Sequence, residues 1–177
     1  KSGAQIIRIT VQNLSEVESL AKIKEQLFDR GYDFPLVADV HFNPKVAEEA
    51  AKVVEKIRIN PGNYTDKKQF KEYQISDSEY KSELDTIRQK LMPLLNICRE
   101  KGTAIRIGVN HGSLSDRIMN RYGDTPEGMA ESAMEFIRIC NEENFKNLVI
   151  SMKASNTHIM VYATRLLKLK MEEEGKI

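Results

Sequence analysis

"GTAIRIGVNHGS", residues 102–113, places Arg106 among isoleucines in a run that is typical of a buried β-strand. The same Ile-Arg-Ile spelling occurs around Arg8, Arg58 and Arg138. A guanidinium among apolar side chains costs free energy unless an anion meets it. These segments therefore carry information about the fold and also about a binding site.

Short β-branched runs alternate along the chain with longer segments of helical periodicity. The predicted strands are residues 4–11, 35–42, 56–60, 103–109 and 147–153. The predicted helices are residues 15–29, a second helix from residue 44, and residues 77–101, 126–143 and 157–174. The predicted caps and first residues of four helices are Ser15 with Glu18, Asn43 with Pro44, Ser76 with Glu79, and Thr125 with Pro126.

This alternation, with near-continuous apolar strands, predicts an α/β fold in which helices cover a parallel sheet. No glycine-rich nucleotide fingerprint follows the first strand, so a TIM-type (β/α) barrel is favoured over a dinucleotide fold. Five strands cannot close an eight-stranded barrel. We therefore expect a partial barrel of about five βα units, with residues 1–177 as a fragment of one barrel domain and an insertion at about 64–78.

Composition narrows the function classes. The chain has 177 residues and a formal net charge of +1, which argues against a nucleic-acid or membrane-surface partner. No apolar run approaches the length of a membrane span, so we expect a soluble chain. The two cysteines, Cys98 and Cys140, each lie on the apolar stripe of a predicted helix, so we expect them to be buried and predict no metal site.

Polar side chains gather near the carboxyl ends of the predicted strands, where parallel barrels place their functional groups. Guanidinium groups suit phosphate oxygens, and several together suit a diphosphate. The predicted substrate-binding residues are Arg8, Arg58, Asn60, Arg106, Asn110, Lys153 and Ser155, and the predicted catalytic pair is Asp39 with His41. We also expect the glycine turns NPGN (60–63) and NHGS (110–113) to bring backbone N–H groups to the same anion.

Arg138 shares the spelling but lies within a predicted helix, so we expect it to face water and exclude it from the site. His111, in the loop after Asn110, is compatible with a site role or a structural one, and we expect His158, at the start of the last helix, to be structural. The positively charged residues at the strand ends are compatible with two functions. One is a barrel enzyme that binds a phosphate ester, and the other is a ligand-binding module without catalytic activity.

Several blocks of the sequence resemble the 4-hydroxy-3-methylbut-2-enyl diphosphate synthase family, the iron–sulfur enzymes of the methylerythritol phosphate route to isoprenoids. The blocks are PLVADVHF (35–42), KIRINPGN (56–63), AIRIGVNHGSLSDRIMNRYGDTPEGMAESAMEF (104–136) and ISMKASN (150–156). The resemblance covers essentially the whole chain and points to the longer plant, chlamydial and Bacteroidetes-type form. It implies that residues 56–60 form the fourth strand of a TIM-type barrel.

The resemblance implies a barrel that binds 2-C-methyl-D-erythritol 2,4-cyclodiphosphate, which the family opens reductively to the linear diphosphate. It also implies a separate domain with a four-iron four-sulfur cluster, a ferredoxin or flavodoxin as electron donor, a homodimer and the bacterial cytoplasm. Neither Cys98 nor Cys140 matches the family's cluster motif, so the cluster ligands are expected outside this chain and the fragment alone is expected to be inactive. The alternative is a non-redox phosphate-ester barrel such as a pterin-type transferase, which a missing Cys-x-x-Cys motif downstream would favour.

Overall fold

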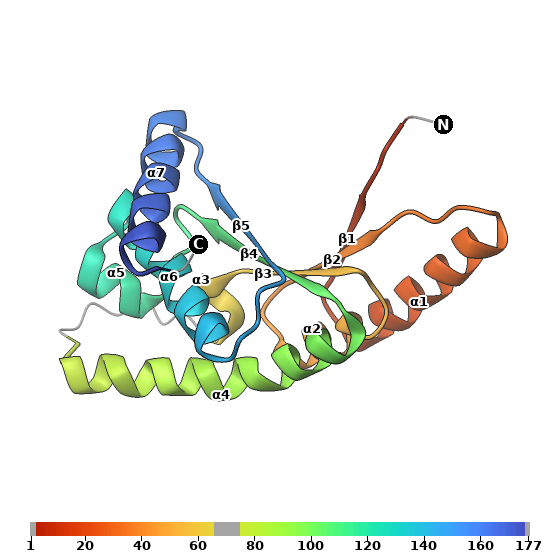
Figure 1. Cartoon of the computed structure of the whole chain (residues 1–177), viewed down its shortest axis with the longest axis horizontal. Helices are drawn as coiled ribbons and strands as arrows, with labels where there is room; N and C mark the ends of the chain where they lie inside the picture. The colour runs from red at the N-terminus through yellow and green to blue at the C-terminus, as the bar shows by residue number, and fades with distance from the viewer. Residues whose placement is uncertain (1–2, 66–74, 176–177) are drawn as a thin grey trace.

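Five parallel strands form one curved sheet in a computed structural model that describes residues 3–65 and 75–175 (Figure 1). The strands are β1 (Ile7–Val11), β2 (Leu36–Val40), β3 (Lys56–Ile59), β4 (Ala104–Asn110) and β5 (Leu148–Lys153). Their order in the sheet equals their order in the chain, and every neighbouring pair is parallel. The predicted α/β class is therefore confirmed, with strand ends that differ by up to three residues from the prediction.

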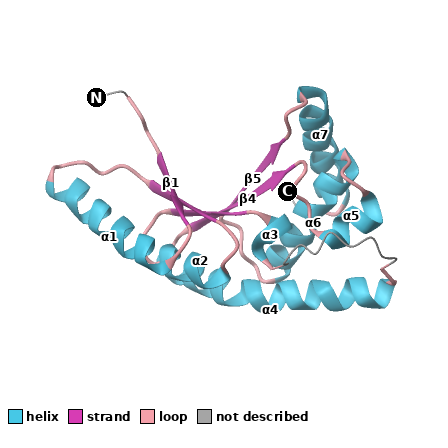
Figure 2. Cartoon of the chain, turned by 180° about the vertical axis from the view of Figure 1, so that it is seen from behind, coloured by secondary structure: helices cyan, strands magenta, loops and turns pink. Residues whose placement is uncertain are grey.

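The helices lie on one side of this sheet, and its other side is open, as Figures 1 and 2 both show. They are α1 (Leu14–Asp29), α2 (Pro44–Ala51), α3 (Pro61–Tyr64), α4 (Asp77–Lys101), α5 (Asp116–Tyr122), α6 (Pro126–Glu142) and α7 (Thr157–Glu173). The five predicted helices are confirmed. The short helices α3 and α5 were not predicted, because four and seven residues are too few to show a helical period. The predicted insertion at 64–78 falls largely outside the described residues.

Side chains that accept hydrogen bonds from the first turn start the helices. Asn43 caps α2, the Ser76–Glu79 capping box starts α4 and Thr125 caps α6, all as predicted. The predicted Ser15–Glu18 box of α1 is wrong. Asn13 caps that helix by accepting a hydrogen bond from the Glu16 amide at 3.0 Å.

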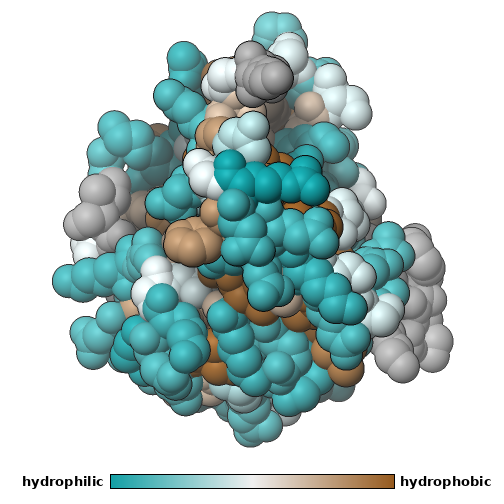
Figure 3. Space-filling view, turned by 90° about the vertical axis from the view of Figure 1, so that its right-hand side faces the viewer, coloured by the Kyte–Doolittle hydropathy of each residue, from teal (hydrophilic) through white to brown (hydrophobic). Residues whose placement is uncertain are grey.

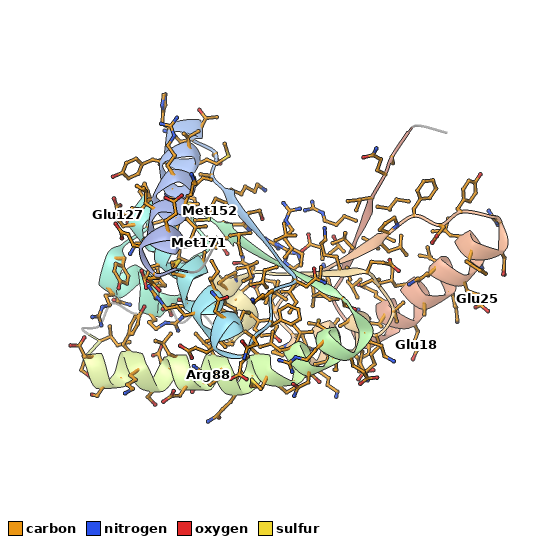
Figure 4. All side chains as sticks on the ribbon, viewed as in Figure 1. Glu18, Glu25, Arg88, Glu127, Met152 and Met171 are labelled. Atoms are coloured by element: carbon orange, nitrogen blue, oxygen red, sulfur yellow. The ribbon has the colours of Figure 1, made fainter. Side chains whose placement is uncertain are left out.

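The prediction failed because Asn13, two residues before Ser15, also has a side-chain oxygen that can accept a hydrogen bond from the first turn of the helix. The Ser15 hydroxyl donates instead to Asn13 Oδ1 at 2.7 Å. Figure 4 shows Glu18 and Glu25 on α1, both pointing away from the sheet. A residue with an equally good capping side chain therefore moved the helix start by one position.

The two faces of the sheet differ sharply in polarity. On the helix-covered face, alternate residues such as Ile57, Ile59, Ile105 and Ile107 are fully buried in one hydrophobic core. Figure 4 shows Met152 of β5 and Met171 of α7 on this side, where both pack against the core. The other face carries polar residues at many of the intervening positions, with Val37 and Val149 among the apolar exceptions. The strands are therefore less continuously apolar than we expected, because helices bury only one face of the sheet.

The surface is largely hydrophilic on the end that carries α1, with apolar atoms visible between the polar side chains (Figure 3). Within residues 3–65 and 75–175, no helix combines the length and the apolar character that crossing a membrane requires.

Candidate functional site

The strand register collects the predicted site residues on the open face of the sheet. Thr10 pairs with Asp39, Asp39 with Arg58, and Arg58 with Arg106, so these four side chains form one layer across β1 to β4. Two residues further along the strands, Gly108 pairs with Ser151, and beyond that Asn110 pairs with Lys153. Because residues two apart in a strand share a face, all of these residues face the open side.

One carboxylate lies at the centre of this face. Asp39 is 6% exposed, and its Oδ1 accepts a hydrogen bond from Arg58 Nη1 at 3.1 Å. His41 Nε2 is 3.4 Å from the same oxygen, and Arg8 Nε is 3.7 Å from Oδ2. A single negative charge therefore faces two guanidinium groups and an imidazole. The predicted Asp39–His41 pair is brought together, and it is joined by two of the predicted arginines.

Arg58 is held by two neighbouring strands. Its side chain is 8% exposed, and Nη2 donates to the carbonyl oxygen of Gly108 on β4 at 3.0 Å, while Nη1 reaches Asp39 on β2. A buried guanidinium needs such partners, because removing it from water costs on the order of several kcal/mol.

Arg106 and Ser151 meet on the next pair of strands. Arg106 Nε donates to Ser151 Oγ at 3.0 Å. Ser151 was missed by the sequence reasoning, as was Lys56, which pairs with Val37 and Ala104 and so shares the open face. Residues two apart in a strand share a face, so Lys56, two before Arg58, and Ser151, two before Lys153, could have been found from the sequence.

The remaining predicted site residues lie at or beyond the strand ends. Asn60 is buried; its side chain accepts from the Gly62 amide at 3.0 Å, which caps α3, and donates to Ser113 Oγ at 3.3 Å. Asn110 is half-buried at the end of β4, whereas Lys153 and Ser155 are exposed. The structure thus places Lys153 next to Asn110 and leaves Ser155 outside the sheet.

The two glycine turns do not offer their glycine N–H groups to an anion, so that expectation is wrong. The Gly62 amide donates to Asn60, and the Gly112 amide donates to Asp124 Oδ1 at 3.0 Å. His111 Nε2 lies 3.1 Å from the carbonyl oxygen of Asp124. The NPGN turn is thus closed on itself, and the NHGS turn is tied to Asp124 beyond α5, neither of which the local glycine signal can reveal.

Arg138 lies in α6, as predicted, but it does not face water freely. It is half-buried, and it pairs with Glu131 on its own helix and with Glu174 just beyond α7, at 2.6 Å from Nη2 to Oε1. The hydrogen bonds that Arg138 donates to Glu174 and Glu131 raise the pKa of its guanidinium despite partial burial. The expectation was wrong because α7 packs against α6 and brings Glu174 to it.

A cavity of about 420 Å³ opens at the carboxyl ends of β1 and β2, lined by Gln12, His41, Phe42 and Asn43. Phe42 has a φ of 61°, and the residue is 72% exposed. A left-handed backbone is strained for phenylalanine, and such strain clusters at functional sites. The cavity thus lies beside His41, at the β1–β2 end of the open face.

The cysteines do not suit an iron–sulfur cluster, which is held by thiolates. Cys98 and Cys140 are buried in the core, and burial raises the pKa of each thiol to about 12. Across the described residues, no three His, Cys, Asp or Glu side chains lie close enough together to hold a metal ion.

Comparison with known proteins bears on both fold and site. The family model of the GcpE TIM-barrel domain matches residues 1–174. The chain is 59% identical over 176 residues to a protein of Parabacteroides distasonis named 4-hydroxy-3-methylbut-2-en-1-yl diphosphate synthase (flavodoxin), covering 99% of this chain and 29% of that protein. The protein of the same name from Akkermansia muciniphila is 54% identical over 175 residues, covering 99% of this chain and 30% of the relative.

The chain therefore spans less than a third of the length of these relatives. Among solved structures, β-methylaspartase from Clostridium tetanomorphum matches with a TM-score of 0.54 at 14% identity, covering 94% of this chain and 33% of that one. At this identity the likeness shows the fold alone.

Proposed function

The chain belongs to the GcpE TIM-barrel domain family, and from this we propose that it is the substrate-binding barrel part of a 4-hydroxy-3-methylbut-2-enyl diphosphate synthase. The substrate in this proposal is 2-C-methyl-D-erythritol 2,4-cyclodiphosphate, whose ring is opened with two electrons and loss of water. The name shared by the relatives supports the activity.

The observation that carries the proposal is the charge imbalance on the open face. Among residues 3–65 and 75–175, Asp39 is the one carboxylate in contact with Arg8, Arg58 and His41, and Arg106 and Lys153 add further positive charge on the same face. The negative charge of a cyclic diphosphate would balance this excess of positive charge. Its oxygens would replace water as the acceptors for the guanidinium groups.

Each predicted residue has a role in this proposal. Arg8, Arg58, Arg106 and Lys153 grip the diphosphate, and Asn60, Asn110 and Ser155 add neutral hydrogen-bonding groups. Asp39 and His41 orient the substrate or move a proton, with His41 Nε2 3.4 Å from Asp39 Oδ1. The cavity beside His41 would take the part of the ligand that extends beyond the diphosphate.

The family's four-iron four-sulfur cluster does not fit the residues of this chain, so no step is assigned to it here. In the proposal its ligands lie outside these 177 residues, and residues 1–177 alone show no turnover. A flavodoxin, which the relatives' names specify, supplies the electrons, and the complete protein works as a homodimer in the bacterial cytoplasm.

Arg106 and Arg138, which both lie between two isoleucines in the sequence, provide the test of this proposal. Arg106→Gln in the complete protein is expected to raise the KM for the cyclic diphosphate by about 10- to 100-fold, because it removes a charge-assisted contact of about 1.4–3 kcal/mol. The matched variant Arg138→Gln removes the same charge from α6 and leaves KM unchanged. Steady-state kinetics measures both. Equal KM values for Arg106→Gln and the unaltered protein would overturn the assignment of the site.

A further inference from the structure

Gly108 occupies a position on the open face of β4 where a side chain has no room. It lies between Arg106 and Asn110, which share its face. A Cβ atom built at Gly108 would lie 2.5 Å from Arg58 Nε, 3.1 Å from Nη2 and 3.2 Å from Cζ. Separations below 3.0 Å are essentially never seen for real Cβ atoms. The Arg58 guanidinium thus fills the space that a side chain at Gly108 would take.

The Arg58 side chain extends toward the carboxyl ends of the strands. The Cα partner of Arg58 is Arg106, yet Arg58 Nη2 donates to the carbonyl of Gly108, two residues further along β4. The contact to Asp39 Oδ1 fixes the other end of the guanidinium. A Cβ at Gly108 would force Arg58 to leave this position and so to loosen both hydrogen bonds.

Gly62 and Gly108 are both closely packed, but they differ in whether the neighbouring atoms belong to the backbone or to a side chain. A Cβ at Gly62 would lie 1.7 Å from the backbone oxygen of Ser113, so a side chain there would collide with the fold itself. At Gly108 the three nearest atoms all belong to the side chain of Arg58. A substitution at Gly108 therefore acts on the arginine before it acts on the backbone.

We propose that Gly108 is a positioning residue for diphosphate binding: its missing side chain lets Arg58 lie across β4 in a fixed orientation that presents positive charge to the ligand. The inference rests on the proposed function for the identity of the ligand. A long, flexible arginine that is already held in place loses less conformational freedom when an anion binds. The glycine therefore contributes to affinity without touching the ligand.

The experiment is a double-mutant cycle in the complete protein, with inorganic pyrophosphate as the probe and isothermal titration calorimetry as the readout. Gly108→Ala is expected to raise the pyrophosphate Kd by about tenfold, because Arg58 is displaced. In the Arg58→Ala background the same change is expected to alter Kd by less than about twofold, because nothing remains for the new methyl group to displace. The binding stoichiometry separates this effect from misfolding, since a partly unfolded sample lowers the stoichiometry and leaves Kd unchanged.

The same cycle is followed by thermal unfolding, where Gly108→Ala is expected to lower Tm only when Arg58 is present. An equal rise in Kd in both backgrounds, or none in the unaltered background, overturns the positioning role while leaving diphosphate binding intact. If the unaltered protein does not bind pyrophosphate, the proposed function fails. In that case an absence of coupling in Tm shows that the contact between Gly108 and Arg58 is not energetically significant, which also overturns the inference.

Discussion

Arg58 and Arg117 are both buried arginines, 7% and 1% exposed, but they lie in opposite electrostatic surroundings. Arg58 shares the carboxylate of Asp39 with Arg8 and His41 on the open face of the sheet. Arg117 lies on α5, and its side chain reaches carboxylates on α4 and α6. Its Nε and Nη2 donate to the two oxygens of Glu135 at 3.1 and 2.7 Å, and Nη1 donates to Glu83 at 3.1 Å.

The difference separates a binding arginine from a structural one. In the helix cluster, the Arg117 guanidinium meets the carboxylates of Glu83 and Glu135, and the Tyr80 hydroxyl also donates to Glu135. On the open face, by contrast, the Asp39 carboxylate is shared by two guanidinium groups and an imidazole. A buried arginine whose charge is matched within the fold stabilises that fold, whereas an unmatched set attracts an external anion.

The largest expected effect comes from Arg117→Met. It leaves Glu135 buried without its guanidinium partner, so the free energy of unfolding is expected to fall by about 3–5 kcal/mol. Urea denaturation measures the change. The affinity of the folded variant for pyrophosphate is expected to change less than about twofold, since Arg117 binds Glu83 and Glu135 whereas Arg58 binds Asp39 and Gly108.

The control for this variant is Arg88→Met. Arg88 projects from α4 (Figure 4) and, like Arg117, pairs with two carboxylates, Glu142 and Glu143, but it is half-exposed. Its loss is expected to cost under about 1 kcal/mol. If Arg88→Met were as destabilising as Arg117→Met, burial would not explain the stability that Arg117 provides.

An intermediate effect is expected from Asp39→Asn. It removes the carboxylate that faces Arg8, Arg58 and His41, so the unfolding free energy is expected to fall by about 2–3 kcal/mol at low salt. Pyrophosphate should then raise Tm more in the variant than in the unaltered protein, because the added anion replaces the missing charge. Asp33→Asn, on the exposed loop before β2, is the control and should respond as the unaltered protein does. An identical pyrophosphate response in Asp39→Asn would show that the cationic surplus is not what binds the anion.

The smallest effect concerns Glu131, which joins Arg138 to Lys170. Burial opposes ionisation, but hydrogen bonds from Arg138 and Lys170 outweigh it and hold the pKa of this carboxyl below its ordinary value of 4.5. Its stabilisation is therefore fully present above pH 4.5 and is lost as the pH falls through the lowered value. Glu131→Gln is expected to cost about 1–2 kcal/mol at pH 7 and progressively less in acid.

Chemical denaturation between pH 7 and pH 3 measures this dependence, with the exposed Glu173→Gln as control. A cost for Glu131→Gln that stayed constant across this range would show that the ionised carboxylate is not the stabilising species. In that case burial of the Glu131 side chain, and not its charge, would account for its contribution to stability.

Local patterns predicted the strands, the five longer helices and most of their caps, because these depend on residues a few positions apart. The same patterns placed Arg8, Asp39, Arg58 and Arg106 on neighbouring strands. They did not reveal that Arg58 lies against Gly108, since those residues are 50 positions apart and their contact depends on strand register. Arg117 was missed for the same reason, because its carboxylate partners lie on two other helices, outside its own segment.

The strand order β1-β2-β3-β4-β5 has a consequence for biosynthesis. A chain leaving the ribosome can add each strand to the edge formed by the strand before it, without waiting for a distant partner. The longest interval separates β3 from β4, because residues 60–103, including α4, must emerge in between. Arg58 therefore leaves the ribosome well before Gly108, and its final position is set only when β4 joins the growing sheet.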